Sequence, residues 1–117
     1  MDEKDVYPTD EELQFIREFD VLKNGYAPLF EYVRNLWWLG YGWEEYVRTD
    51  DYESSDGLAC VPYKHNYRVV MMSTGGWSGN ESIIKALREN PHFWYCCEME
   101  RKGGHYVFEV EEKSWKR

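Results

Sequence analysis

The segment "VVMMSTGGWSGNESIIKALREN", residues 69–90, decides the fold because its hydrophobic period changes within a few residues. The apolar run "YRVVMMST" at 67–74 predicts a strand. After the glycines, residues three and four apart predict the buried stripe of a helix, formed by Ile83, Ile84 and Leu87. Asn90 before Pro91 predicts the end of that helix, because the residue before a proline avoids the helical conformation.

The glycine-rich turn is the first candidate site. Glycines permit positive φ angles and close approach of the backbone to a ligand. Backbone N–H groups that lead into a helix N-terminus can bind an anion. Trp77 would then stack on a flat ring such as a base. The candidate ligand-binding residues here are Gly75, Gly76, Trp77, Ser78, Gly79 and Asn80.

An ordinary strand-to-helix turn explains the same segment. In that alternative, Ser78 caps the helix in a capping box with Glu81, and Trp77 fills the core. The segment lacks both the Gly-Lys-Ser/Thr ending of a P-loop and the GxGxxG spacing of dinucleotide-binding folds. The two interpretations stay open at this point.

A second glycine pair lies in "RKGGHY", residues 101–106, between the predicted strands 92–100 and 105–112. Gly-Gly favours the tight turn of a hairpin. Alternation places Phe93, Tyr95, Cys97 and Met99 on one face of the first strand, and Tyr106, Phe108 and Val110 on one face of the second. This motif adds the candidate ligand-binding residues Gly103, Gly104, His105 and Tyr106, with Arg68 and Arg101 as possible charge contacts. The alternative is that His105 is an ordinary exposed strand residue.

The front of the chain predicts two helices. Thr9 with Glu12 matches a capping box, and Asn24-Gly25 ends the first helix. A second helix spans "APLFEYVRNLWWLG", residues 27–40. Strands are expected at 43–48 and on both sides of "KHN", residues 64–66. The expected fold is α+β: two N-terminal helices, a largely antiparallel sheet, a third helix after the Gly-rich loop, and a C-terminal hairpin. Residues 1–117 form one domain, with frayed ends at 1–8 and 113–117.

The formal charge of −8 argues against direct binding of duplex nucleic acid, which needs a basic face. Part of the acidity lies in an exposed loop, "DDYESSDG". It supplies a candidate partner face that imitates a phosphate track and would block a basic cleft, as on a nuclease: Asp50, Asp51, Glu53 and Asp56. The alternative is a solvated surface.

Several classes of function receive little support. Three cysteines without a CxxC spacing fit a reducing cytoplasm and give no metal site. The acidic start "MDEKDVYPTDEE" lacks the apolar core of a signal peptide, and no apolar run approaches membrane-spanning length, so a cytosolic protein is expected. No cofactor is expected. An enzyme would draw on Cys96 or Cys97 with His105, or on Glu98 with Glu109, but no catalytic signature surrounds them, so no catalytic residue is assigned. Homo-oligomerisation is open, because the aromatic-rich composition allows it and specifies no interface.

The pair "STGGWSGNESIIKAL" and "FWYCCEMERKGGHYVFEV" resembles a group of small accessory proteins of tailed bacteriophages and prophages. The likeness covers about residues 67–110. It implies phage origin and a role in the host cytoplasm, and brings no established active site. Accessory phage proteins commonly act by binding, so the resemblance implies either sequestration of a small anionic nucleotide-like ligand or inhibition of a host defence protein.

Overall fold

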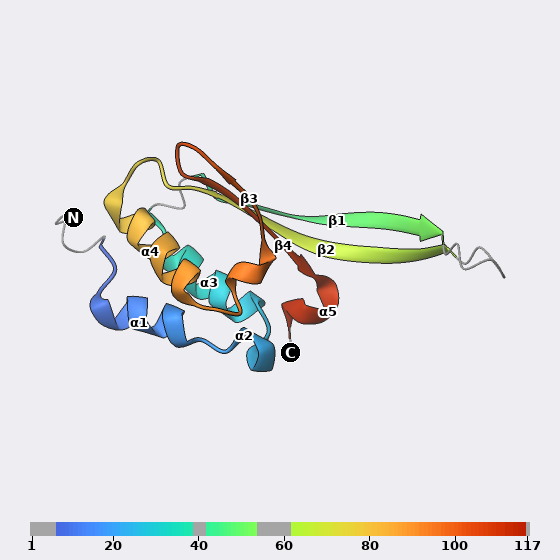
Figure 1. Cartoon of the computed structure of the whole chain (residues 1–117), viewed down its shortest axis with the longest axis horizontal. Coiled ribbons are helices and arrows are strands. Elements are labelled where there is room, and N and C mark those ends of the chain that lie inside the picture. The colour runs from blue at the N-terminus through green and yellow to red at the C-terminus, as the bar shows by residue number, and fades with distance from the viewer. Residues whose placement is uncertain (1–6, 39–41, 54–61, 117) are drawn as a thin grey trace.

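The computed structural model describes residues 7–38, 42–53 and 62–116. It confirms the α+β class (Figure 1). The helices and strands, in chain order, are α1 (Asp10–Glu18), α2 (Val21–Asn24), α3 (Ala27–Leu36), β1 (Glu44–Glu53), β2 (Pro62–Ser73), α4 (Ser78–Glu89), the 3-10 turn η3 (Trp94–Cys96), β3 (Cys97–Arg101), β4 (His105–Glu111) and α5 (Glu112–Trp115).

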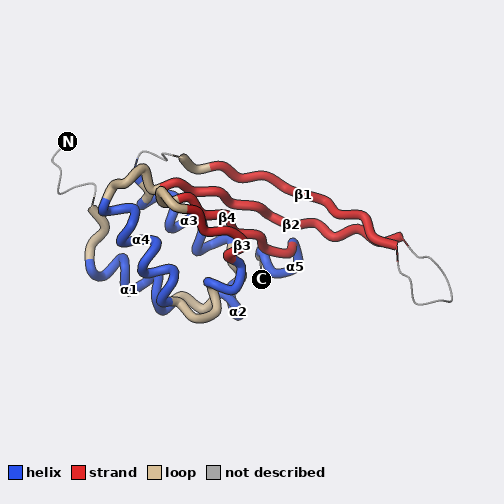
Figure 2. The backbone as a smooth tube through the Cα atoms, turned by 45° about the horizontal axis from the view of Figure 1, so that its top comes forward, coloured by secondary structure: helices blue, strands red, loops and turns tan. Residues whose placement is uncertain are grey.

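Within these residues the strands form one antiparallel sheet in the order β1-β2-β4-β3. The helices cover one face of this sheet, and the other face is open (Figure 2). The core lies between the two layers, where Phe30 of α3 meets Phe93 and Phe108 with ring centroids 5.1 and 5.8 Å apart. All three side chains are fully buried. Ile83, Ile84 and Leu87 of α4 join this core, which confirms the predicted helix stripe.

The first predicted helix is divided in two. The capping box of Thr9 and Glu12 is present at the start of α1, as predicted. The chain leaves the helix at Phe19, and Asp20 starts α2 by accepting hydrogen bonds from the backbone N–H groups of Leu22 and Lys23, both at 3.1 Å. Asp20 favours the start of α2 at this point because its side chain caps the new helix, and α1 therefore ends before it.

The prediction of two strands around "KHN" was wrong. β2 runs without interruption from Pro62 to Ser73 and pairs with β1 along Glu44–Glu53. Pro62 is the first residue of β2, a position where its missing N–H is tolerated. The loop of this hairpin falls at 54–61, outside the described residues.

Two differences concern the C-terminal part. Phe93 and Tyr95 do not lie in a strand, because a turn and η3 precede β3, which begins at Cys97. The segment after β4, expected to fray, forms α5, and Trp115 is buried at 8% exposure. Its ring stacks on Phe30 with centroids 5.5 Å apart. The apolar area of one tryptophan is sufficient reason for this docking.

The β1–β2 hairpin projects from the body as an arm (Figure 1). β2 pairs with β4 only from Tyr67 to Ser73, so the rest of the hairpin has no further strand beside it among the described residues. The extents are 63 × 28 × 21 Å. The radius of gyration is 16.5 Å, against about 13 Å for a compact domain of 100 residues.

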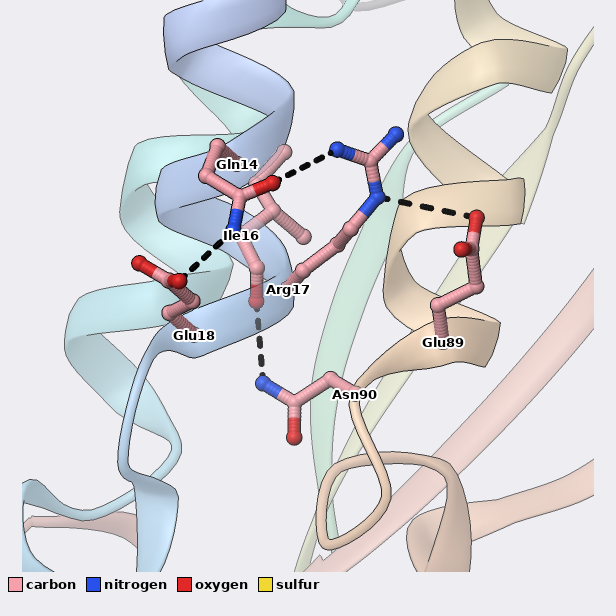
Figure 3. A network of polar contacts seen from close by, with 6 residues as sticks. All are labelled: Gln14, Ile16, Arg17, Glu18, Glu89 and Asn90. Atoms are coloured by element: carbon pink, nitrogen blue, oxygen red, sulfur yellow. Dashed lines mark hydrogen bonds and ion pairs between the residues drawn. The ribbon is translucent and has the colours of Figure 1, made fainter.

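A buried amide joins α1 to α4 (Figure 3). Asn90, 2% exposed, donates from Nδ2 to the carbonyl oxygens of Ile16 and Phe19, both at 2.9 Å. Its Oδ1 accepts from the N–H of Phe93 at 3.2 Å. One side chain thus satisfies three backbone groups at the end of two helices. The ion pair of Arg17 with Glu89 lies beside it at the surface, at 3.6 Å.

We expect Asn90→Ala to lower the free energy of unfolding by about 2–4 kcal/mol, because buried backbone groups lose their partners. Glu89→Ala removes only the neighbouring surface ion pair and should change it by less than about 1 kcal/mol. Urea denaturation followed by tryptophan fluorescence measures both. Equal effects of the two substitutions would contradict the role given to the amide.

Candidate functional site

The structure brings the two glycine motifs side by side at one end of the sheet. Ser73, the last residue of β2, pairs with His105, the first residue of β4. The Oγ of Ser73 lies 2.6 Å from Nδ1 of His105. The N–H of Thr74 donates to the carbonyl oxygen of Gly104 at 2.9 Å. The strand exit and the hairpin turn therefore form one structural unit.

Two buried polar side chains hold this unit together. Thr74 is 1% exposed and Asn80 is fully buried. Asn80 accepts from the N–H of Trp38 at 3.0 Å and donates to the carbonyl oxygen of Thr74 at 3.4 Å. It thus connects the end of α3, the exit of β2 and the first turn of α4. Asn80 was predicted to bind ligand, but this position gives it a structural role.

Two N–H groups of the glycine turn are already bonded within the turn, which takes them from the predicted anion site. Gly76 donates to Oγ1 of Thr74 at 3.2 Å, and Trp77 donates to the carbonyl oxygen of Thr74 at 3.1 Å. Gly75 and Gly76 have φ angles of 64° and 76°, so their glycine character is explained by the backbone conformation. Phosphate binding by the N–H groups of Gly76 and Trp77 would require the turn to open.

The Trp77 ring packs within an aromatic group. It stacks on Trp38 with centroids 5.4 Å apart and lies 4.8 Å from Tyr7. It also covers Gly79, where an added Cβ would overlap the indole ring. Trp77 is half-buried and packs at the start of the helix, outside the main core in which the alternative interpretation placed it.

The predicted capping box of Ser78 and Glu81 was wrong. α4 begins one residue earlier than that box requires, because the carbonyl oxygen of Trp77 accepts from the N–H of Glu81 at 3.1 Å. Trp77 is the N-cap residue and supplies no side-chain hydrogen bond. The hydroxyl of Ser78 instead donates to the Tyr7 hydroxyl at 3.3 Å.

The second motif divides between the two faces of the sheet. Gly103 and Gly104 form the turn with φ angles of 94° and 80°. His105 is exposed on the open face. Tyr106 faces the helices, where its ring meets Trp94 at 6.1 Å, so this ring and the His105 side chain point to opposite faces of the sheet.

The two predicted charge contacts separate in the same way. Arg101 pairs with His105 across β3 and β4 and shares its face. Arg68 lies on the helix side, where it forms a two-pronged ion pair with Glu112 at 2.9 and 3.1 Å. The Glu112 carboxylate raises the pKa of Arg68 through this hydrogen bond. Arg68 is thus far from the glycine motifs in the fold and serves to fasten α5.

A depression of about 410 Å³ lies beside the hairpin turn, within the range of small-molecule sites. Arg101, Lys102 and His105 supply its basic and polar side chains. Met71, Met99 and Val107 are neighbours across β2, β4 and β3 and supply an apolar surface. The remaining lining residues are Met72, Ser73 and Tyr106.

Sequence reasoning missed the apolar part of this depression because of a bulge in β3. Alternation predicted Met99 on the same face as Cys97. The β3–β4 register shifts between these residues, with Cys97 opposite Phe108 and Met99 opposite Val107. The bulge therefore turns Met99 to the open face. No residue type in "CCEME" marks this shift. Met71 and Val107 could have been found from their spacing to Ser73 and His105.

The structure does not favour either of the considered cysteine–histidine pairs. Cys96 is buried, and burial raises the pKa of its thiol well above the ordinary range. Burial also raises the pKa of Cys97, which faces the helices and not His105. Both thiols are therefore protonated at neutral pH and are poor nucleophiles. In the described part of the chain, no three His, Cys, Asp or Glu residues are grouped to hold a metal.

The acidic residues lie away from the depression. Asp50, Asp51 and Glu53 occupy the distal half of β1 in the arm, and Asp56 lies outside the described residues.

No described helix combines the length and apolarity needed to cross a membrane. Comparisons of this chain with protein families, with curated proteins and with solved structures found no match.

We expect Gly104→Ala to destabilise the protein more than Gly103→Ala. Both substitutions put a side chain at positive φ, which costs about 1 kcal/mol. Only the Cβ at position 104 would overlap Oγ1 of Thr74, whereas at 103 the nearest atoms, in the His105 ring, lie 3.5 Å away. The difference should be at least about 1 kcal/mol, measured by urea denaturation. Equal losses would show that the close approach at Thr74 does not constrain the turn.

Proposed function

We propose that this chain is a binding protein that holds a small anionic, nucleotide-like ligand in the depression at the hairpin turn. The observation that carries the proposal is the convergence of Arg101, Lys102 and His105 on a concave surface, in a chain of net charge −8. Local positive charge against an acidic background attracts an anion to this place. His105 and Arg101 were predicted site residues and belong to this depression, where basic side chains take the place of the glycine-turn amides as anion ligands.

The polar groups suit a phosphate. Arg101 and Lys102 would form charge-assisted hydrogen bonds with its oxygens. If the Ser73 hydroxyl donates to Nδ1 of His105, the neutral ring carries its proton on Nε2, which is then a donor for the ligand. Ser73 is therefore a positioning residue for His105.

The apolar surface suits the flat part of the ligand. Met71, Met99 and Val107 present two thioethers and a branched side chain next to the polar rim. Methionine sulfur makes favourable contacts with aromatic rings. Arg101 lies against the same surface, with a nitrogen of its guanidinium 3.8 Å from the Met99 sulfur. These side chains take the stacking role that the sequence analysis gave to Trp77.

We place this activity in counter-defence by a bacteriophage, in the cytoplasm of the host. The support is the resemblance of the two glycine motifs to accessory phage proteins. A protein that holds a nucleotide without converting it removes that nucleotide from a signalling pathway. This role requires no catalytic group.

We expect isothermal titration against mononucleotides, cyclic nucleotides and inorganic phosphate to find at least one ligand. Arg101→Gln should weaken its binding at least about tenfold, because a charge-assisted hydrogen bond contributes about 1.5–3 kcal/mol. Met99→Ala should weaken binding of a nucleotide more than binding of phosphate, because only the nucleotide has a flat part.

The matched control is Lys113→Gln, which removes one positive charge from a surface ion pair with Glu111 in another part of the fold. It should leave the affinity unchanged. Absence of binding by every compound, or equal affinities of the Arg101 and Lys113 variants, would refute the proposal. Turnover of the ligand by the wild-type protein, lost in His105→Ala, would show instead that the protein is an enzyme.

A second proposal is inhibition of a basic host protein by the acidic arm. The observation that favours it is the projection of the β1–β2 hairpin, with Asp50, Asp51 and Glu53 in its distal half (Figure 1). A narrow acidic projection can enter a cleft that a nucleic acid would otherwise occupy. Opposite charges would then steer the two proteins together.

We expect inhibition of purified bacterial nucleases with basic clefts, and we expect it to weaken as salt is added. Asp50→Lys/Asp51→Lys should abolish it. Glu31→Lys/Glu81→Lys makes the same change of charge on α3 and α4 and should retain it. Inhibition that is equal at low and high salt, or equal in the two variants, contradicts the electrostatic mechanism.

A further inference from the structure

The outer edge of the sheet is formed by β1, which pairs with β2 along Glu44–Glu53 without a bulge. Tyr46 is 49% exposed and Val47 is 50% exposed. Successive strand residues point to opposite faces, so this edge carries an exposed apolar side chain on each face. A long, regular edge of this kind is a template for another strand.

The backbone groups that β1 offers to such a strand follow from its ladder. The carbonyl oxygen of Gly42 accepts from the N–H of Ser73 at 3.1 Å, so Gly42 faces β2. Because backbone direction alternates along an antiparallel pair, the even-numbered residues of β1 also face β2. The N–H and C=O groups of Glu45, Val47 and Thr49 therefore point away from the sheet.

Symmetry restricts how a second copy can pair with this edge. A two-fold axis perpendicular to the sheet keeps each face of the sheet continuous across the two copies. Directly opposite residues then point to the same face, so the axis must lie at one residue of β1, which pairs with its own copy. Axes at Glu44, Glu45 or Arg48 place that charged residue opposite its own copy. Axes at the neighbouring positions 47 and 49 place Glu44 opposite Asp50, or Glu45 opposite Glu53. Like charges directly opposite one another are unfavourable.

The axis through Tyr46 is the exception among positions 44–49. It places Glu44 opposite Arg48 of the second copy, twice, on the open face of the sheet. The two Tyr46 rings become cross-strand neighbours on that face. Glu45 and Val47 form the hydrogen-bonded pairs, which agrees with the outward direction of their backbone groups.

We propose that two copies of this chain pair antiparallel through β1, with the two-fold axis at Tyr46, to form one continuous antiparallel sheet. The helices of both copies lie on the same side of that sheet, and the two open faces form one surface. Self-complementary charge and an exposed, regular edge carry the proposal. It does not depend on the ligand proposed above.

Sedimentation velocity across the micromolar range tests the dimer. Glu44→Arg places arginine opposite Arg48 of the second copy, and Arg48→Glu places glutamate opposite Glu44. Each single variant should raise the dimer dissociation constant at least about tenfold. An equimolar mixture of the two variants should dimerise again, because a heterodimer restores opposite charges at both positions.

This rescue separates the interface from folding. Arg48 also bridges to Glu109 within its own chain, at 3.2 Å, so a loss in Arg48→Glu alone could be structural. A damaged fold would not be repaired by mixing. A mixture that stays monomeric, or a wild-type protein that is monomeric at every concentration, overturns the proposal.

Proline substitution provides a matched backbone test. Val47→Pro removes an outward N–H and leaves the β1–β2 ladder intact, so it should abolish the dimer and keep the circular dichroism spectrum. Tyr46→Pro removes an N–H that faces β2 and should disturb the monomer as well. A dimer that survives Val47→Pro uses another surface, and that result rejects the β1 interface.

Discussion

The Asn80 amide is the interaction on which the rest of the structure depends. It joins the backbone of Trp38, at the end of α3, to the carbonyl oxygen of Thr74, where β2 leaves the sheet. Thr74 in turn binds the turn before β4 through Gly104. The fully buried Asn80 side chain therefore joins the end of α3 to the exit of β2, and the hairpin turn is bound to that exit in turn. Because a buried amide without partners is costly, the positions of these segments are coupled.

Local signals in the sequence predicted those elements whose ends depend on neighbouring residues. The α4 stripe of Ile83, Ile84 and Leu87 and the hairpin turn at Gly103-Gly104 agree with the structure. Errors arose where a distant partner decided the outcome. β2 continues through "KHN" because β1 pairs with it along its length. The start of α4 depends on the packing of Trp77 against Trp38 and Tyr7, which no capping pattern reports.

The candidate site differs from the predicted glycine-turn site for the same reason. The glycine turn had the composition of an anion site, but composition does not show that Gly76 and Trp77 donate their N–H groups within the turn. The bulge in β3 then brought Met99 to the face of His105. Proximity of the two glycine motifs follows from the β2–β4 pairing. The face to which Met99 points could not be predicted from spacing alone.

The projecting arm has a consequence for how this protein moves through water. A particle of 63 × 28 × 21 Å has more friction than a sphere of the same 14.1 kDa mass. It therefore diffuses slowly and leaves a gel-filtration column early, as a heavier globular protein would. Elution volume alone overstates the mass of a single chain. The assembly state is better determined from light scattering or sedimentation equilibrium, which do not assume a shape.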